Sequence, residues 1–213
     1  MSAAHARRKV SNPLALAVLS NLRERPMHPY ELSRVLREHG DARSIRYNHG
    51  SLYMVVRQLA KAGYIAEQGT TREGQRPERT VYALTDAGRH ELTDWLGDLL
   101  AHPQYEYPAL VSALALVAAL PPTQVVDLLR TRLGLLAGRR REIDELIELS
   151  RTQGVSELFL VEEQYRQALL DTEATFLEGF IAQICDPQTP WLAAWAGFHD
   201  DPAGHTSAET KGH

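Results

Sequence analysis

The chain of 213 residues is long enough for one large or two small domains, and its hydrophobic content of 44% suffices for a folded core. Its single cysteine, Cys185, excludes an intrachain disulfide and any cysteine-rich zinc site. No apolar run is long enough to span a bilayer, and the N-terminal residues lack the apolar stretch of a signal peptide. The cytoplasm is therefore the expected location, and no membrane partner is expected.

The charge divides the chain into two unlike halves. Residues 1–90 contain fifteen Lys and Arg against eight Asp and Glu, a net charge of +7, whereas residues 91–213 contain eight against nineteen, a net charge of −11. A basic region attracts polyanions, so the pattern indicates a nucleic-acid-binding first half joined to a second half with another role. Residues 1–11 are expected to form a flexible basic arm, which either touches the DNA backbone or is an ordinary solvated tail.

Two short helices are expected after this arm. Asn12 and Pro13 form a cap followed by proline at the first helical position, and residues 14–22 are mostly apolar, which predicts burial. Pro29 begins a second helix that ends near Gly40. The segment 41–47 connects it to the next helix, and three of its side chains are expected near phosphates: Arg43, Arg46 and Tyr47.

The stretch 48–65 predicts the helix that enters the DNA. Asn48 is a suitable N-cap with Ser51 at N3, and Gly63 suits the C-terminal end. One face is apolar at helical spacing, through Leu52, Val55, Val56 and Leu59. The entrance and the opposite face carry the candidate DNA-contacting residues His49, Ser51, Tyr53 and Arg57, with Lys61 beyond them. Such a helix fits the major groove, which is about 12 Å wide, although an ordinary amphipathic surface helix has the same pattern.

A β-hairpin is expected directly behind this helix. Residues 64–68 and 79–84 are rich in strand-forming side chains, and they flank a Gly- and Arg-rich loop. Helix, then hairpin, is the order of a winged helix-turn-helix. Arg72, Arg76 and Arg79 place positive charge on the wing, where phosphates are the expected counter-ligand.

The second half of the chain predicts long helices. Thr85 is expected to cap a helix that runs to about Ala101, which completes a winged helix-turn-helix domain over residues 12–101. Residues 102–108 contain two prolines and are expected to form a hinge. A helix over 123–152 carries apolar residues at heptad spacing, which are the candidate dimerisation residues: Val126, Leu129, Leu133, Leu136, Ile143 and Ile147. Arg140 interrupts this seam.

A second long helix is expected over 156–184, with Leu158, Tyr165, Leu169, Phe176 and Phe180 along one side. The two helices have more apolar surface than one pair can cover, because Leu128, Leu135, Leu146 and Leu149 add a second stripe. Residues 109–185 are therefore expected to be a helical dimerisation domain. Residues 186–213 are expected to be mostly disordered, apart from Trp191 and Trp195, which could pack back onto the body.

Three stretches resemble the PadR family of bacterial transcriptional regulators. MHPYELSRVLRE (27–38) is similar to its second-helix motif, GSLYMVVRQLAKAGYI (50–65) to its recognition helix, and RPERTVYALTDAGR (76–89) to its wing strand and wing exit. Pro29 stands where glycine is usual, and Val56 where leucine is usual. Residues 105–184 look like the C-terminal dimerisation domain of the larger subfamily. The resemblance implies a mostly α-helical homodimer that binds double-stranded operator DNA and leaves it when an effector binds.

A small aromatic or lipophilic effector is the expected further partner, at the junction of the two domains. The aromatic residues proposed to bind it are Trp95, Tyr105, Tyr107 and Tyr165, with Phe176 also available. The alternative is that these side chains only hold the junction together.

Other functions have weaker support in the sequence. No P-loop, Rossmann glycine motif, G-x-S-x-G or H-E-x-x-H motif is present, so neither an enzyme nor a cofactor is expected. A metal-sensing regulator is an alternative because the chain has nine histidines, but none are spaced i, i+4. A winged-helix module for protein contacts alone is a further alternative, against which the Arg-rich wing argues.

Overall fold

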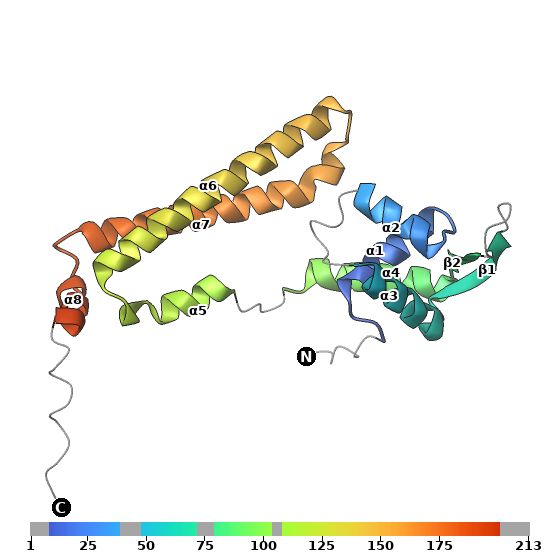
Figure 1. Cartoon of the computed structure of the whole chain (residues 1–213), viewed down its shortest axis with the longest axis horizontal. Helices are drawn as coiled ribbons and strands as arrows, with labels where there is room; N and C mark the ends of the chain where they lie inside the picture. The colour runs from blue at the N-terminus through green and yellow to red at the C-terminus, as the bar shows by residue number, and fades with distance from the viewer. Residues whose placement is uncertain (1–8, 39–47, 72–78, 104–107, 201–213) are drawn as a thin grey trace, which may run out of the picture. The chain divides into compact units, whose positions relative to one another are not determined.

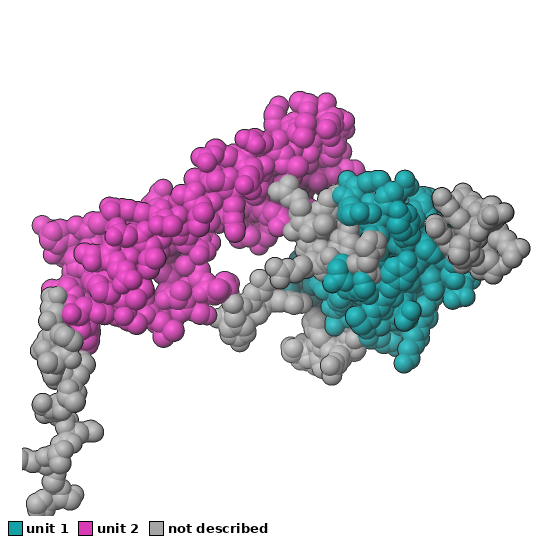
Figure 2. All heavy atoms as spheres, in the orientation of Figure 1, with its two compact units in different colours: residues 1–105 teal, residues 106–213 magenta. Residues whose placement is uncertain are grey.

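The structure is a computed structural model that describes residues 9–38, 48–71, 79–103 and 108–200. The chain forms two compact units, Met1–Tyr105 and Glu106–His213 (Figure 2). The predicted fold class is confirmed: the described residues are mostly helical, and their one sheet is an antiparallel pair of strands. No helix among the described residues combines the length and apolar character that a bilayer crossing requires.

The N-terminal unit has the winged-helix order (Figure 1). Its elements are α1 (Pro13–Glu24), α2 (Pro29–Glu38), α3 (His49–Ala62), β1 (Ile65–Thr71), β2 (Arg79–Leu84) and α4 (Asp86–Ala101). The Asn12 side chain accepts a hydrogen bond from the Leu14 amide at 2.9 Å, so the predicted cap of α1 is confirmed. Leu14, Leu19, Leu32 and Leu36 are fully buried in one core with α3.

The predicted flexible arm is wrong at its C-terminal end. Val10 is 6% exposed and belongs to the N-terminal core, and the Lys9 ammonium lies 5.9 Å from the centre of the Tyr64 ring. Burial of an apolar side chain and a cation–π contact hold this part of the chain in place. Arg7 and Arg8 lie outside the described residues.

The C-terminal unit is a long helical hairpin with shorter helices at one end (Figure 1). Its elements are α5 (Ala109–Ala115), the 3-10 turn η2 (Val117–Ala119), α6 (Pro122–Thr152), the 3-10 turn η3 (Glu157–Leu160), α7 (Val161–Cys185) and α8 (Leu192–Asp200). Gly154 has φ 79°, and this left-handed backbone allows the chain to leave α6 and turn back as α7. The helix predicted over residues 123–152 is confirmed: α6 begins one residue earlier, at Pro122, and ends at Thr152 as expected.

The predicted use of the heptad seam is wrong. Its members pack inside one chain, against α7: Val126, Leu129, Leu136, Ile143 and Ile147 are at most 7% exposed, and Leu133 is partly buried in the same cluster. The interrupting Arg140 also bonds within the hairpin, because its guanidinium donates to Asp171 of α7 at 3.0 Å and to Asp144 of α6. The buried members of the seam are therefore used within one chain, and Leu133 alone among them stays partly exposed.

The predicted disorder from residue 186 is wrong as far as residue 200. Helix α8 lies in this range, and Trp195 is 7% exposed within the core formed by α6 and α7. The Trp195 ring stacks on Phe180 at 6.5 Å between centroids and donates its Nε1–H to the Leu120 carbonyl at 2.9 Å. The expectation that the tryptophans could pack back is thus confirmed for Trp195. Residues 201–213 lie outside the described part.

Candidate nucleic-acid interface

Helix α3 is held at both ends by the residues that the sequence suggested. The Asn48 side chain accepts from the Ser51 amide, the Ser51 hydroxyl accepts from the Asn48 amide, and both distances are 2.8 Å. This reciprocal pair is a capping box. At the other end Gly63 has φ 80°, a left-handed conformation that glycine adopts without strain.

The capping box gives Ser51 a structural role. Its hydroxyl hydrogen is donated to the Asn48 carbonyl at 2.8 Å, while its oxygen accepts the Asn48 amide. A hydroxyl has one hydrogen to donate, so Ser51 has no donor left for a base edge. In this structure the Ser51 hydroxyl fixes the start of the helix, and base reading by Ser51 stays a prediction.

The buried face of α3 anchors the helix in the N-terminal core. Leu52, Val55, Val56 and Leu59 are at most 2% exposed, as their spacing predicts. The opposite face presents Tyr53 and Met54, which are 39% and 57% exposed, together with exposed Arg57 and Lys61. No ion pair is recorded for either cation within the described ranges. This face combines two cationic groups with an aromatic and a thioether side chain.

The sequence analysis missed Met54 as a surface residue. Its position three residues before Arg57 places it on the exposed side of the helix, and this spacing was available in the sequence. An apolar side chain here is suited to contact a thymine methyl group in the major groove.

The wing is attached to the helical body at its base. Its register pairs Ile65 with Leu84 and Thr71 with Arg79, with an irregularity between Glu67 and Gly69. A third segment joins the sheet through Met27, whose amide and carbonyl both bond to Tyr82 at 3.0 Å. Met27 is 1% exposed. Since the hairpin is fixed to the α1–α2 connection, its base cannot move independently of the helices.

A second attachment links the wing exit to the end of α3. The Thr85 hydroxyl accepts from the Gly88 amide at 3.0 Å and lies 2.8 Å from the Gly63 carbonyl and 2.9 Å from the Tyr64 carbonyl. Thr85 thus caps α4, as predicted, while bonding the turn after α3. Gly88 makes this approach possible, because a Cβ atom there would lie 2.0 Å from the Tyr64 carbonyl oxygen.

The charge of Arg57 on α3 affects the pKa of Tyr82 on strand β2. Burial raises the pKa of the Tyr82 hydroxyl, the adjacent hydrogen-bonded Glu67 carboxylate raises it further, and the Arg57 charge opposes the shift. The charge on the exposed face of α3 therefore acts on a side chain of the wing strand β2.

Several predicted contact residues have no described side chain. Arg43, Arg46, Tyr47, Arg72 and Arg76 lie outside the described residues. For His49 and Arg79 only the backbone is described, at the first positions of α3 and β2. Tyr53 and Arg57 are the predicted DNA-contacting residues whose side chains are placed on the exposed face.

The residues suggested for effector binding are only partly placed. Trp95 is 6% exposed in the N-terminal core, so its ring serves packing there, whereas Tyr165 on α7 is 64% exposed. Tyr105 and Tyr107 lie outside the described residues. Within the described ranges, no three His, Cys, Asp or Glu side chains gather in a group that could hold a metal ion.

Comparison with known proteins finds a family match within this unit. Residues 18–94 match the transcriptional regulator PadR-like family. The chain is 33% identical over 84 residues to the negative transcriptional regulator PadR of Bacillus subtilis (strain 168), and 32% identical over 89 residues to the probable transcriptional regulator Rv1176c of Mycobacterium tuberculosis. These alignments cover 39% and 40% of this chain and 44% of each relative, so they span less than half of each protein.

The fold resembles solved structures over a larger part of the chain. A crystal structure of Bacillus subtilis PadR in complex with operator DNA matches 81% of this chain and 98% of its own, with a TM-score of 0.63 at 21% identity. Another, of the same protein in complex with p-coumaric acid, matches 81% and 99% with a TM-score of 0.63 at 19% identity. Residues 18–94 of the chain thus match the PadR-like family of transcriptional regulators, and the fold over most of the chain resembles PadR structures.

Proposed function

We propose that the protein is a transcriptional repressor that binds double-stranded operator DNA as a homodimer and releases it when a small molecule binds. The exposed face of α3 is the observation that carries this proposal, because Tyr53, Met54 and Arg57 stand on a helix that is capped at both ends and seated on a core. A fixed helix with cationic and apolar groups on one side suits base contacts in the major groove. DNA binding would take place in the cytoplasm.

The relatives support the direction of the effect and its control. The matched Bacillus subtilis protein is described as a negative regulator, and its solved structures include complexes with operator DNA and with p-coumaric acid. The proposal carries over the class of these partners, operator DNA and a small aromatic or lipophilic effector. Measuring binding to the upstream region of the protein's own gene, with and without a panel of small aromatics, tests it.

Arg57 is proposed to contact a base edge, and Arg57→Ala should weaken operator binding by about 1–3 kcal/mol, or roughly 5- to 150-fold. Specificity should relax at one position in each half-site, because only the base opposite Arg57 loses its partner. Fluorescence anisotropy with single-base operator variants measures both effects.

Arg139→Ala is the matched control, since it removes the same charge from an exposed position of the C-terminal unit. If Arg57→Ala binds the operator as well as Arg139→Ala does, and its base preferences are unchanged, the DNA surface lies elsewhere.

The dimer face is proposed to be the outward side of the helical hairpin, in place of the buried seam. Leu158, Val161, Tyr165, Leu169 and Phe176 follow one another at three-, four- and seven-residue steps from η3 along α7, and each is more than half exposed. On α6, Leu128, Leu135 and Leu149 are also at least half exposed and recur at multiples of seven. Apolar surface of this extent is typical of an interaction face. A two-fold dimer would place two recognition helices one DNA turn apart, about 34–36 Å.

A further inference from the structure

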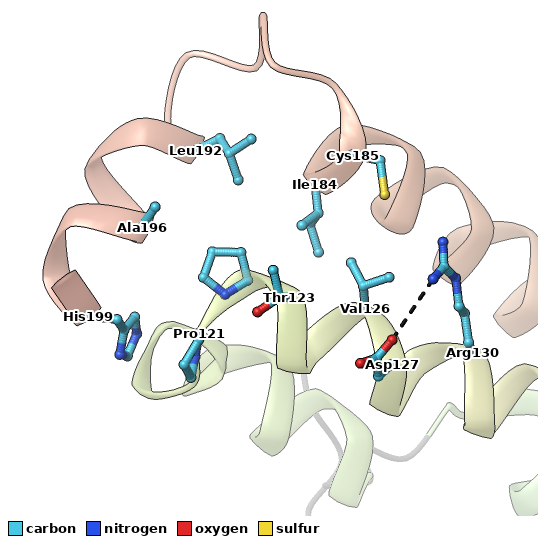
Figure 3. A pocket seen from close by; sticks show the side chains of 11 residues that line it. Pro121, Thr123, Val126, Asp127, Arg130, Ile184, Cys185, Leu192, Ala196 and His199 are labelled. Atoms are coloured by element: carbon cyan, nitrogen blue, oxygen red, sulfur yellow. Dashed lines mark ion pairs between the residues drawn. The ribbon is translucent and has the colours of Figure 1, made fainter.

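A hollow opens in the C-terminal unit where α8 faces the hairpin (Figure 3). Its volume is about 580 Å³. Val126 of α6 and Ile184 of α7 form its most buried walls, at 6% and 5% exposure. Leu192 and Ala196 of α8 close the opposite side, and both are half-buried. The volume lies within the range of small-molecule sites, about 300–1,000 Å³.

The α8 wall of this hollow is held in place by contacts within the chain. Trp195 donates to the Leu120 carbonyl at 2.9 Å and stacks on Phe180. The His199 ring bonds to the Ala118 carbonyl at 3.0 Å, and since a carbonyl can only accept, His199 Nε2 carries the hydrogen. A preformed wall spares a ligand the free-energy cost of ordering it.

The polar groups around the hollow select against a charged ligand. Arg130 and Asp127 line the same end and already pair with each other, at 3.9 Å between nitrogen and oxygen. The chain from residue 91 onward has a net charge of −11, which disfavours anions. Asp127 and Arg130 together carry no net charge, so the lining offers neither a cation nor an anion an unbalanced partner. The hollow therefore offers apolar walls to a ligand. Hydrogen-bonding side chains, such as those of His199 and Thr123, lie at its rim.

We propose that this hollow binds a small, uncharged, lipophilic compound of two or three rings with a hydrogen-bonding group at one end, and that it is the effector site. The second part rests on the proposed function. The hollow replaces the domain junction as the proposed effector site. The sequence had suggested the junction, but Trp95 packs in the N-terminal core.

Two dyes that share a ring skeleton test the chemical class on the full-length protein without DNA. N-phenyl-1-naphthylamine is neutral, and 1-anilinonaphthalene-8-sulfonate is its sulfonated analogue. The neutral dye should bind with enhanced fluorescence and at least about tenfold more tightly than the sulfonate, a difference of about 1.4 kcal/mol. Equal or tighter binding of the sulfonate would overturn the assignment to uncharged ligands.

Two substitutions in α8 locate the binding. Ala196→Phe places a ring inside the hollow and should weaken binding of the neutral dye at least about tenfold. Ala193→Phe adds the same ring at an exposed position of α8 that does not line the hollow, and should leave binding unchanged. Equal dye affinity in both variants would place the dye elsewhere and overturn the proposal.

The only cysteine of the chain gives a second measurement that needs no variant. Cys185 is exposed and lines the hollow, so its alkylation by iodoacetamide reports whether the site is accessible and whether it is occupied. The neutral dye should slow the alkylation of Cys185 in proportion to the fraction of protein that has bound the dye. A thiol that reacts at the same rate with saturating dye, or that does not react in the free protein, would overturn the proposal.

Measuring operator release tests whether the hollow is the effector site, which is a separate question from whether it binds a ligand. If the hollow is the effector site, the neutral dye should release operator DNA from the wild type and from Ala193→Phe, but not from Ala196→Phe. Dye that binds in the hollow without weakening operator binding would overturn the effector role. A protein that binds no operator at all would contradict the proposed function, while the dye and alkylation measurements would still decide whether the hollow is a ligand site.

Discussion

Gly88→Ala is expected to destabilise the N-terminal unit by about 2 kcal/mol. The new Cβ would lie 2.0 Å from the Tyr64 carbonyl oxygen, which is a backbone atom and cannot rotate away. Overpacking of this kind costs about 1–3 kcal/mol or more, and a fixed backbone partner favours the upper end. The gain from replacing glycine in a helix, at most about 1 kcal/mol, does not offset it. For a unit of this size the loss lowers Tm by about 8–16 °C.

The same helix provides the control for this prediction. Gly97 also lies within α4, but an added Cβ would meet nothing within 4 Å. Gly97→Ala should therefore stabilise the unit by about 0.5–1 kcal/mol. Trp95, buried in this unit, reports its unfolding when Trp191 and Trp195 are replaced by Phe. Equal Tm values for the two alanine variants would show that Thr85 and Gly88 do not determine how α4 docks.

Leu169→Asp is expected to produce folded monomers that have lost operator affinity at least about 100-fold. Leu169 is 52% exposed, so a carboxylate at this position remains hydrated in the monomer and should change its stability by no more than about 0.5 kcal/mol. In the proposed dimer the same carboxylate would be buried without a partner, which costs several kcal/mol. Loss of the dimer removes the avidity of two linked DNA contacts, worth about 10²–10⁴ in affinity.

Leu177→Asp, on the same helix, separates this effect from unfolding. Leu177 is 0% exposed in the core between α6 and α7, so the substitution should unfold the C-terminal unit. Sedimentation velocity and circular dichroism should show Leu169→Asp helical and monomeric, and Leu177→Asp with reduced helix content. A Leu169→Asp protein that sediments as a dimer and binds operator normally would place the interface away from this face of α7.

The parts of the structure that depend on local chemistry could be predicted from the sequence. Asn12, Asn48 and Thr85 cap the helices at which they were expected, and Gly63 takes the left-handed conformation at the end of α3. Each of these choices depends on a few neighbouring residues and the backbone groups that they satisfy. The hairpin followed in the same way from two segments rich in strand-forming side chains around a Gly- and Arg-rich loop.

The errors arose where periodicity predicts burial without naming the partner. Leu129 and Leu136 were correctly expected to be buried, but the heptad spacing does not distinguish a second copy from α7 of the same chain. The helical pattern of residues 192–200 was too short to identify α8, which is held by contacts to Phe180 and Leu120 far away in sequence. Gly88 fitted the family motif, but only the folded chain shows the close approach of Tyr64 that requires a glycine.

Selection from a random duplex library tests the central claim most directly, because it needs no assumption about the regulated genes. The full-length protein should enrich a two-fold-related sequence with half-site centres one helical turn apart, about 10–10.5 base pairs, or a multiple of that distance. Arg57→Ala should enrich the same sequence with one position relaxed in each half-site, and binding to the selected duplex should fall steeply with salt. A wild-type protein that enriches no sequence, or enriches one without two-fold symmetry, would contradict the account of a dimeric, operator-binding repressor.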